Sequence, residues 1–338
     1  MKITTVGLDI AKSIFHFFAV NKAGAKVKKK VLKRSQVLPC FAQMESCVIA
    51  MEACGSAHYW ARSLEALGHT VKLIAPQYVK PFLKGNKNDY NDAEAIAEAA
   101  QRPTMRFVPI KTVEQQDVQL VHRRRERLIK ERTALVNQIR GQLAEYGIVI
   151  HKGVAAVRSQ LPRILEDAGN DLTVLAREYF FESYESLADL DGKCRACEKK
   201  LEVINKENAL CQRLDDIHGI GSVTATALYA AAGDGKEFKN GRHMSAWLGL
   251  VPGQHSSGGK NTLLGISKRG NSYLRTLLIH GARAVLMHCE GKKDRLSVWA
   301  LALKERRGHN IACVAVANKL ARIAWVVMAR EEEYRMAV

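Results

Sequence analysis

The order of strand-like and helix-like segments in the first hundred residues restricts the fold more than any other feature of this sequence. Residues 3–8, 14–20 and 26–32 are β-rich runs, the last two joined by a turn-like segment, and they predict a three-stranded antiparallel start. The elements predicted next are a helix at 35–45, a strand at 47–51, a helix at 56–67, a strand at 70–75 and a helix at 91–100. Strands that alternate with helices in this way predict an α/β sheet.

The remainder of the chain is mostly helical, and the length of 338 residues favours two or three domains. Charged helical patterns at 112–146 and 187–212 predict an antiparallel coiled-coil arm, although the first also fits a long helix with a solvated face. A loop rich in glycine and serine at 253–261 precedes helices predicted at 271–288, 294–306 and 311–330. We therefore predict an α/β domain at 1–108, a helical linker and dimerisation region at 109–212, and a mainly α domain at 213–338.

The chain is strongly basic, with 52 Lys and Arg against 34 Asp and Glu and a formal net charge of +18. This excess is typical of a nucleic-acid binder, although a ribosomal or membrane-surface protein could share it. Residues 236–283 contain a single acid, and the helical run at 112–146 contains Arg123, Arg124 and Arg125, which we predict to contact nucleic acid. No stretch approaches the roughly 18–20 apolar residues of a membrane span and no signal peptide is recognisable, so we expect a cytoplasmic protein without a membrane partner.

The eight cysteines are scattered and show no framework of disulfides. Cys194 and Cys197 form the one C-x-x-C motif, with no second pair near them and a helical pattern around them. We interpret them as core residues rather than as zinc ligands.

Four acidic residues occupy positions from which an α/β sheet can direct them toward one point. Asp9 and Glu52 follow two predicted strands, and Asp89 and Asp92 lie at the start of a predicted helix with a spacing that can aim both the same way. Converging carboxylates suit a pair of hard divalent ions, with Mg²⁺ the usual choice for phosphoryl chemistry. Each acid alone is better explained as a cap, a turn former or a surface residue, but the four together predict a ribonuclease-H-like nuclease core.

The segment from Ile217 to Gly221, before a helix predicted at 222–232, has the form of a helix-hairpin-helix turn. Gly219 and Gly221 permit a tight backbone that points amides at a phosphate beside a helix N-terminus. A purely structural glycine turn between two helices is the competing explanation.

Six motifs, in their order and spacing, resemble the bridge-RNA-guided DEDD transposases of the insertion sequence 110 family over nearly the whole chain. They are Gly7 to Lys12, Glu52 to Gly55, Asn88 to Ala93, Gly249 to Pro252, Ser256 to Gly259 and Ile266 to Asn271. The segment from Ala53 to His58 is also similar to the insertion sequence 1111 subgroup. The resemblance implies a bacterial transposase that cuts and rejoins DNA, with a ribonuclease-H-like (RuvC-like) N-terminal domain, a coiled-coil arm and a mainly α transposase domain.

The resemblance also implies the roles of particular residues. It assigns four metal ligands to Asp9, Glu52, Asp89 and Asp92, around a two-ion site for Mg²⁺ or, alternatively, Mn²⁺. It assigns the nucleophile to Ser257, which precedes Gly258, with the neighbouring Ser256 as the alternative. The family often has Arg after the loop's proline, whereas this chain has Gly253, so Lys260, Lys268 or Arg269 could supply the phosphate contact instead.

The activation of this serine is less well defined by the sequence. A hydroxyl is a poor nucleophile until a base or a metal lowers the cost of its deprotonation. His255 is close, but adjacent loop residues rarely face each other, so we expect a solvated or core-capping His and prefer metal activation by the acidic domain. The resemblance further implies that two protomers share each site, that homodimers form a tetramer in the synaptic complex, and that a noncoding bridge RNA pairs with target and donor double-stranded DNA.

Three other interpretations stay open. A junction-resolving endonuclease would use the same four acids with water as nucleophile, and it would not need Ser257. An actin-like sugar kinase would share the first strand and its Asp-containing turn, but it would need further glycine-rich phosphate loops and would not be so basic. A catalytically silent DNA-binding scaffold would use the acids only as caps, and metal-dependent DNA cleavage would distinguish it from the others.

Overall fold

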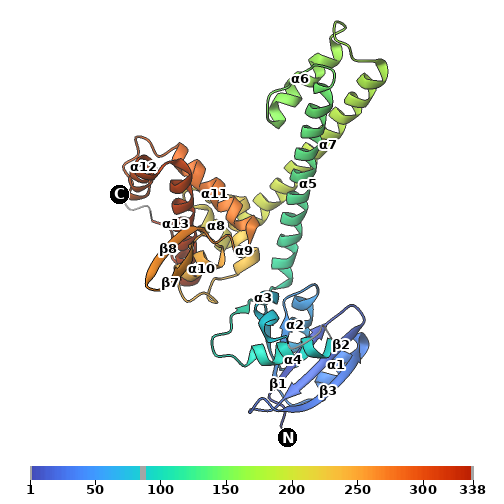
Figure 1. Ribbon diagram of the computed structural model, residues 1–338, viewed down its shortest axis with the longest axis vertical. Helices are drawn as coiled ribbons and strands as arrows, with labels where there is room; N and C mark the ends of the chain where they lie inside the picture. Colours follow the sequence, from blue (N-terminus) through green and yellow to red (C-terminus); the bar gives the residue numbers. More distant parts are fainter. Residues whose placement is uncertain (1, 84–88, 336–338) are drawn as a thin grey trace. The chain divides into compact units, whose positions relative to one another are not determined.

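The computed structural model describes residues 2–83 and 89–335, and for residues 89 and 90 it describes the backbone alone. The chain divides into two compact units, residues 1–113 and 114–338 (Figure 1). The second unit contains both the helical arm and the C-terminal helices, and their predicted division into two domains at residue 213 stays a prediction.

The first unit is an α/β domain. Its strands are β1 (Thr5–Ile10), β2 (Ile14–Val20), β3 (Lys26–Lys33), β4 (Val48–Glu52), β5 (Thr70–Ile74) and β6 (Phe107–Val108). Its helices are α1 (Val37–Ala42), α2 (Ala57–Glu65), α3 (Pro76–Val79) and α4 (Asp89–Ala100), with short 3-10 turns at Arg34–Gln36 and Lys80–Phe82. The α/β domain expected from the alternating pattern is confirmed.

The strands form one six-stranded sheet in the order β3-β2-β1-β4-β5-β6. β1, β2 and β3 are antiparallel neighbours, as predicted, whereas β4 and β5 run parallel to β1. The carboxyl ends of β1, β4 and β5 therefore meet at one edge of the sheet, which is where α/β proteins place their chemistry.

The two faces of this sheet pack against different helices, because successive residues of a strand point to opposite faces. Leu8 and Met51 lie in one core with Phe41 of α1 and Trp60 of α2. On the opposite face, Ala50 and Ile74 pack against Ile96 of α4. Phe18 and Val20 meet Ala93 and Ala97 of α4 on that same face.

The second unit begins with the helical arm and continues into a mainly helical C-terminal part. Its helices are α5 (Val113–Ala144), α6 (Val154–Glu166), α7 (Val174–Glu207), α8 (Ala209–Asp215), α9 (Ser222–Ala232), α10 (Gly241–Trp247), α11 (Ser272–Met287), α12 (Arg295–Arg307) and α13 (His309–Arg330). A hairpin of β7 (Pro252–Ser257) and β8 (Lys260–Ile266) lies between α10 and α11.

In the arm, α5 and α7 run antiparallel and side by side (Figure 1). Polar contacts tie them together along their length, from Arg125 with Glu198 to Gln138 with Tyr179. Asp191, which is 6% exposed, accepts from Arg132 of α5 and Arg158 of α6. Between these ion pairs, Cys194 and Cys197 are buried against Leu128, which confirms their interpretation as core residues.

The second arm helix differs from the prediction of 187–212. It starts at Val174, because the Thr173 hydroxyl caps it by accepting from the Ala176 amide. It ends at Glu207, because Asn208 has an extended backbone and its side chain caps α8 instead. The helical pattern continues across Asn208, which is why the sequence alone merged the two helices.

The core of the C-terminal part is built around α13. Val316, Leu320 and Ala324 of this helix are fully buried among residues of α8 to α12. By length and composition α13 reaches the size of a membrane span, contrary to our expectation that no segment would. Half of its apolar window is buried inside the protein, which accounts for its composition as a core helix.

Candidate active site

Asp9 and Glu52 are neighbours at the carboxyl ends of adjacent parallel strands. Leu8 of β1 pairs with Met51 of β4. The residues that follow them, Asp9 and Glu52, therefore lie next to each other on the face of the sheet that packs against α4. Both acids also lie close to the Cys54 thiol. Burial, and then the charges of Glu52 and Asp9, raise the pKa of this thiol. Two carboxylates side by side repel each other, and oxygen ligands of this kind fit a hard divalent cation.

Small residues allow α4 to approach this face of the sheet closely. A Cβ atom on Gly7 would lie 2.1 Å from the carbonyl oxygen of Ala93 and 2.7 Å from the amide of Ala97. Gly7 pairs with Ala50 in the sheet, so two small residues face two alanines of the helix. This close approach fixes the start of α4 over the strand that contains Asp9.

The two acids of α4 complete the predicted set. Asp92 directly precedes Ala93, and Asp89 begins the helix one turn before Ala93. The side chain of Asp89 lies outside the described residues. Asp9, Glu52 and Asp92 do not by themselves form a three-ligand metal cluster within the described part of the chain, so a four-acid site depends on Asp89 as well.

His16 is a candidate that the sequence analysis missed. It pairs with Asp9 across β1 and β2, which places both side chains on the same face of the sheet. The short connection at residues 11–13 sets this register, and a shift by one residue would turn His16 to the other face. The hairpin spacing was the only signal in the sequence that could have identified it.

The predicted loop at 253–261 is instead a β-hairpin. Gly258 and Gly259 form its two-residue turn with φ of +55° and +79°, values that favour glycine and match the twist of the strands. We missed the strands because their sequences, PGQHSS and KNTLLGI, contain few β-branched or aromatic residues. Ser257 ends β7 at the turn, and Ser256 accepts a 2.8 Å hydrogen bond from Gln254 Nε2.

The base of the hairpin is held by tight backbone contacts. The Ser267 amide donates to the Val251 carbonyl at 2.8 Å. A Cβ atom on Gly249 would lie 2.0 Å from the Arg269 carbonyl oxygen, and one on Gly270 would lie 1.9 Å from that of Trp247. These contacts leave the side chains of Lys260, Lys268 and Arg269 exposed, as a phosphate contact requires.

Two family models match the chain where these groups lie. A model of the DEDD transposases of the IS110 type matches residues 6–148, and a model described as the transposase IS116/IS110/IS902 family matches residues 211–297. The chain is 48% identical to a probable family 20 transposase of Pseudomonas aeruginosa over 99% of both chains. This chain belongs to the IS110/IS116/IS902 transposases.

Other relatives of this transposase come from different bacteria. It is 48% identical to the transposase for insertion sequence element IS1111A of Coxiella burnetii, over 98% of this chain and 92% of the relative. It is 40% identical to the transposase for insertion sequence element IS1328 of Yersinia enterocolitica, over 96% of both. Membership of the family makes this chain a DNA-processing enzyme that binds DNA, and a DEDD domain implies a divalent metal.

In the C-terminal part of the transposase, the predicted helix-hairpin-helix turn joins α8 to α9. Gly219 has φ of +90° and packs closely on α11, since a Cβ atom there would lie 2.7 Å from Val285 and 3.0 Å from the Gly281 carbonyl oxygen. This packing favours the structural explanation for Gly219. Gly221 is the N-cap of α9, and its surroundings are more open.

The three predicted arginines of α5 have different surroundings. Arg123 and Arg124 are exposed, and Arg124 lines a small groove of about 240 Å³ together with Lys193 and Lys200 of α7. Arg125 is turned inward and donates twice to one oxygen of Glu198, at 2.6 and 3.0 Å. Arg123 and Arg124 are therefore better placed than Arg125 to contact a phosphate.

A buried chain of hydrogen bonds connects the arm of the transposase to α9. Thr226 Oγ1 donates to the Ser222 carbonyl at 2.6 Å, so it accepts from His122 Nε2 at 3.1 Å. The other ring nitrogen of His122 then accepts from the Tyr273 hydroxyl at 3.0 Å. Burial, and then the charge of Arg125, lowers the pKa of His122 to about 4, which keeps the ring neutral.

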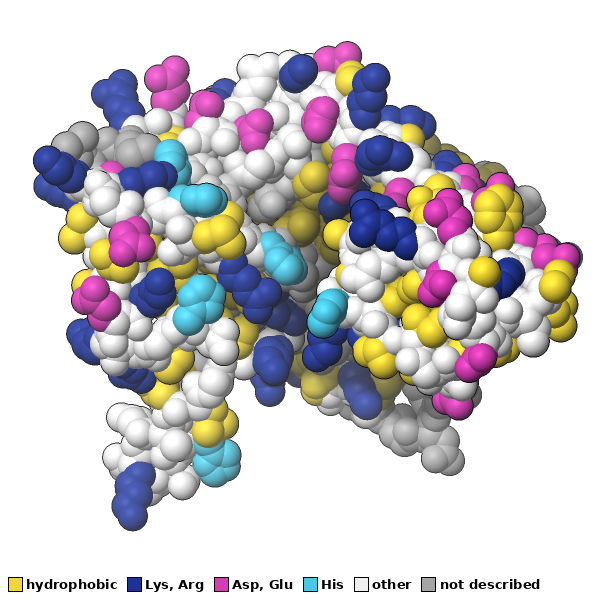
Figure 2. Space-filling model, turned by 90° about the horizontal axis from the view of Figure 1, so that it is seen from above, with side chains coloured by type: hydrophobic (Ala, Val, Ile, Leu, Met, Phe, Trp, Pro, Cys, Tyr) yellow, Lys and Arg dark blue, Asp and Glu magenta, His cyan; other side chains and the backbone are white. Residues whose placement is uncertain are grey.

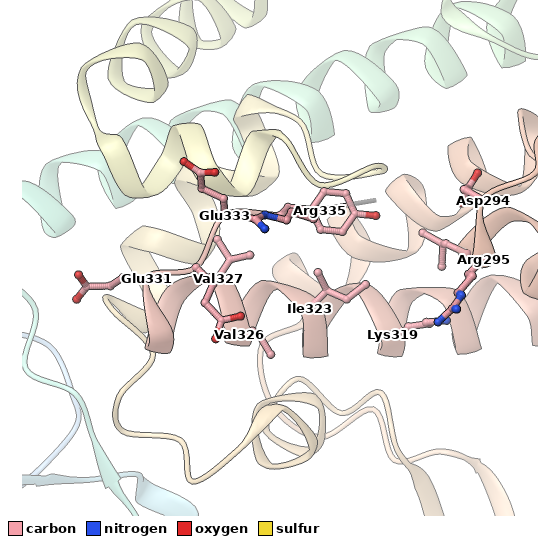
Figure 3. Close-up of a pocket in the computed structure, with 12 residues that line it drawn as sticks. Asp294, Arg295, Lys319, Ile323, Val326, Val327, Glu331, Glu333 and Arg335 are labelled. Carbon is pink, nitrogen blue, oxygen red and sulfur yellow. The ribbon is translucent and has the colours of Figure 1, made fainter. Parts of the chain in front are cut away.

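Among the described residues, neither the surface charge nor the hollow beside α13 adds a candidate site. Figure 2 shows Lys and Arg side chains at many places on the visible face, with Asp and Glu side chains among them. A hollow of about 980 Å³ lies between α13, the start of α12 and the C-terminal segment (Figure 3). Its rim includes Glu331, Glu332 and Glu333, and it contains none of the predicted site residues.

Proposed function

We propose that this transposase cuts DNA by attack of Ser257 on a phosphodiester, with Asp9, Glu52, Asp89 and Asp92 holding divalent metal beside the scissile phosphate. The observation that carries the proposal is the adjacency of Asp9 and Glu52 at the end of two parallel strands, beneath the start of α4. Mg²⁺ fits these oxygen ligands best, and Mn²⁺ is the alternative. When bound, the metal neutralises phosphate charge and lowers the cost of deprotonating a hydroxyl.

The hairpin supports serine as the nucleophile rather than water. Ser257 lies at the tip of an exposed hairpin, next to a turn without side chains, where a DNA strand can reach its hydroxyl. Attack by this oxygen would join the DNA covalently to the protein and conserve the phosphodiester energy for rejoining. Lys268, Arg269, Arg123 and Arg124 would contact the DNA or RNA backbone, with Gly221 as a further amide contact.

The proposed architecture and partners extend the family assignment. A hairpin start followed by parallel strands supports a ribonuclease-H-like (RuvC-like) first unit, and the antiparallel pair of α5 and α7 supports a coiled-coil arm that dimerises. We propose that a noncoding bridge RNA of the element guides a cytoplasmic enzyme to its DNA. We further propose that homodimers form the synaptic tetramer, in which acids and serine come from different protomers.

The acidic site is tested by replacing single carboxylates. Asp9→Asn and Asp89→Asn should abolish strand cleavage of a plasmid carrying the element while the circular dichroism spectrum stays unchanged. Glu94→Gln, on the same helix as Asp92, is the matched control and should cleave normally. Cleavage by Asp89→Asn in Mg²⁺ at the rate of Glu94→Gln would remove the four-acid site from the proposal.

The same plasmid separates the serine mechanism from a junction-resolving nuclease. In a denaturing gel, wild type should show DNA bound covalently to protein, and Ser257→Ala should show none. Cleavage by Ser257→Ala without an adduct would favour water as the nucleophile.

A further inference from the structure

The register of the β7–β8 hairpin separates the two candidate serines onto opposite faces. Directly paired residues of antiparallel strands point to the same face, and so do residues two apart on one strand. Ser257 pairs with Lys260 and His255 pairs with Thr262, so these four side chains share one face. Ser256 shares the other face with Gln254 and Asn261, and their hydrogen bonds show this directly.

The two faces offer different chemistry to a phosphate. The Ser256 face carries amides, which neither accept a proton readily nor carry charge. The Ser257 face carries His255 and Lys260, the only ionisable side chains of the hairpin. Our expectation that His255 would not face the serine assumed a loop, and the strand geometry overturns it.

Both groups are within reach of Ser257. Lys260 is directly opposite, where Cβ atoms of paired residues are about 4.5–5.5 Å apart. His255 is two residues earlier on the same strand, about 7 Å along it at the usual rise per residue. The lysine and histidine side chains span these distances, and all three residues are exposed to an incoming strand.

We propose that Ser257, Lys260 and His255 act together as one catalytic face of the hairpin: the Lys260 ammonium binds a non-bridging oxygen of the scissile phosphate, and His255 accepts the serine proton. This inference rests on the proposed role of Ser257 and adds the groups that make it reactive. It also selects Ser257 over Ser256.

The step balances without any further reactant. The Ser257 hydroxyl gives its proton to the neutral imidazole of His255 as its oxygen forms a bond to phosphorus. The bond from phosphorus to the leaving sugar oxygen breaks on the opposite side, and that oxygen takes a proton from solvent, to which the imidazolium returns the proton it accepted. Lys260 keeps its charge throughout and stabilises the negative charge that builds up on the non-bridging oxygen.

The test measures the rate of covalent protein–DNA adduct formation by the full chain in a single turnover, with saturating protein and DNA carrying the joined ends of the element. Lys260→Met should slow the adduct about 100-fold, the usual effect of losing one transition-state contact, and Lys260→Arg should recover most of it. His255→Gln should also slow it about 100-fold. Asn261→Ala, on the Ser256 face, is the matched control and should keep the wild-type rate.

The dependence on pH distinguishes a proton acceptor from a structural residue. A general base accepts the serine proton only in its unprotonated form, so the wild-type rate should fall in acid. His255→Gln should lose that dependence, whereas Lys260→Met should keep it at a lower rate. A His255→Gln profile parallel to that of wild type would overturn the role of His255.

The variants also separate this inference from the proposed function on which it rests. An adduct that persists in Ser257→Ala would contradict the nucleophile itself. An adduct that disappears in Ser257→Ala, but forms in Lys260→Met and His255→Gln as fast as in Asn261→Ala, would overturn the catalytic face alone.

Discussion

At the scale of single residues, Gly7 fixes the position of α4 over β1 and so positions the proposed acidic site. Its backbone lies so close to α4 that any side chain would overlap the carbonyl of Ala93. Asp9 is two residues further along the same strand, and Asp92 is next to Ala93. The distance between the Asp9 and Asp92 carboxylates therefore depends on how closely α4 packs against Gly7.

The substitution Gly7→Ala should damage both stability and cleavage. The added methyl group forces α4 away from β1, which we expect to cost about 1–3 kcal/mol or more, as overpacking usually does. Thermal unfolding should shift down and strand cleavage should be lost. Gly55→Ala is the control, because a Cβ atom there meets nothing within 4 Å, and it should change neither quantity. Equal behaviour of the two variants would show that the close packing of α4 has no consequence.

The placement of Asp9 and Glu52 at neighbouring strand ends was predictable from sequence, whereas their surroundings were not. Asp9 and Glu52 follow apolar strands, and parallel strands bring such positions to one edge of a sheet. The position of His16 beside Asp9 depends on the register of the β1–β2 hairpin, which the pattern of residues did not determine. The role of Gly7 could not be predicted because it depends on which helix packs across the sheet, and packing between distant segments decides this.

At the scale of elements, the His122 chain of hydrogen bonds joins α5, α9 and α11. His122 is 4% exposed, and its neutral ring uses one nitrogen to donate to Thr226 and the other to accept from Tyr273. Arg125 of α5 also bonds Tyr273 and extends the chain to Glu198 of α7. Protonation of His122 would remove its acceptor and place a second cation beside Arg125.

We therefore expect the second unit to lose stability in acid. The pKa of His122 is lowered from 6.5 to about 4, so the neutral ring stabilises the fold fully above about pH 6.5. This contribution is lost as the pH falls toward 4, and the lowering corresponds to roughly 3 kcal/mol at its limit. Urea unfolding at pH 7 and pH 5 should show a larger loss for wild type than for His122→Gln.

A second histidine with a lowered pKa, His58 of the first unit, must be separated from His122 in this measurement. Burial lowers the pKa of His58 to about 4 as well, so acid should also weaken the first unit, and to the same extent in both proteins. Identical losses in wild type and His122→Gln would mean that His122 does not contribute to the pH dependence.

The elements of the arm and of the hairpin show where sequence patterns are ambiguous. The helix-like pattern of 187–212 was real, but two capping residues, Thr173 and Asn208, determine where α7 starts and ends. The hairpin was predicted as a loop because its strands are exposed on both sides and contain few β-branched or aromatic residues. Its two glycines were a turn signal, but periodicity identifies a strand only when one of its faces is buried.

At the scale of the whole molecule, the charge of +18 favours binding to a long polyanion. We expect the purified transposase to carry one specific RNA transcribed from the noncoding DNA of its element. Its affinity for that RNA should fall steeply as salt rises, because counterions are released at every neutralised phosphate. Sequencing the co-purified nucleic acid checks this. Random cellular fragments, together with recombination by ribonuclease-treated protein, would contradict the guide.

The exposure of the serine hairpin has a consequence for fidelity. A two-stranded ribbon with solvent on both faces is at best marginally stable, and here backbone contacts hold its base to the rest of the fold. If Ser257 is the nucleophile as proposed, the groups on the tip would become ordered when a DNA strand lies against them, and part of the binding free energy would be spent on assembling the site. A poorly matched strand supplies less of that free energy. Discrimination between DNA sites would then appear in the rate of cutting, beyond any difference in affinity.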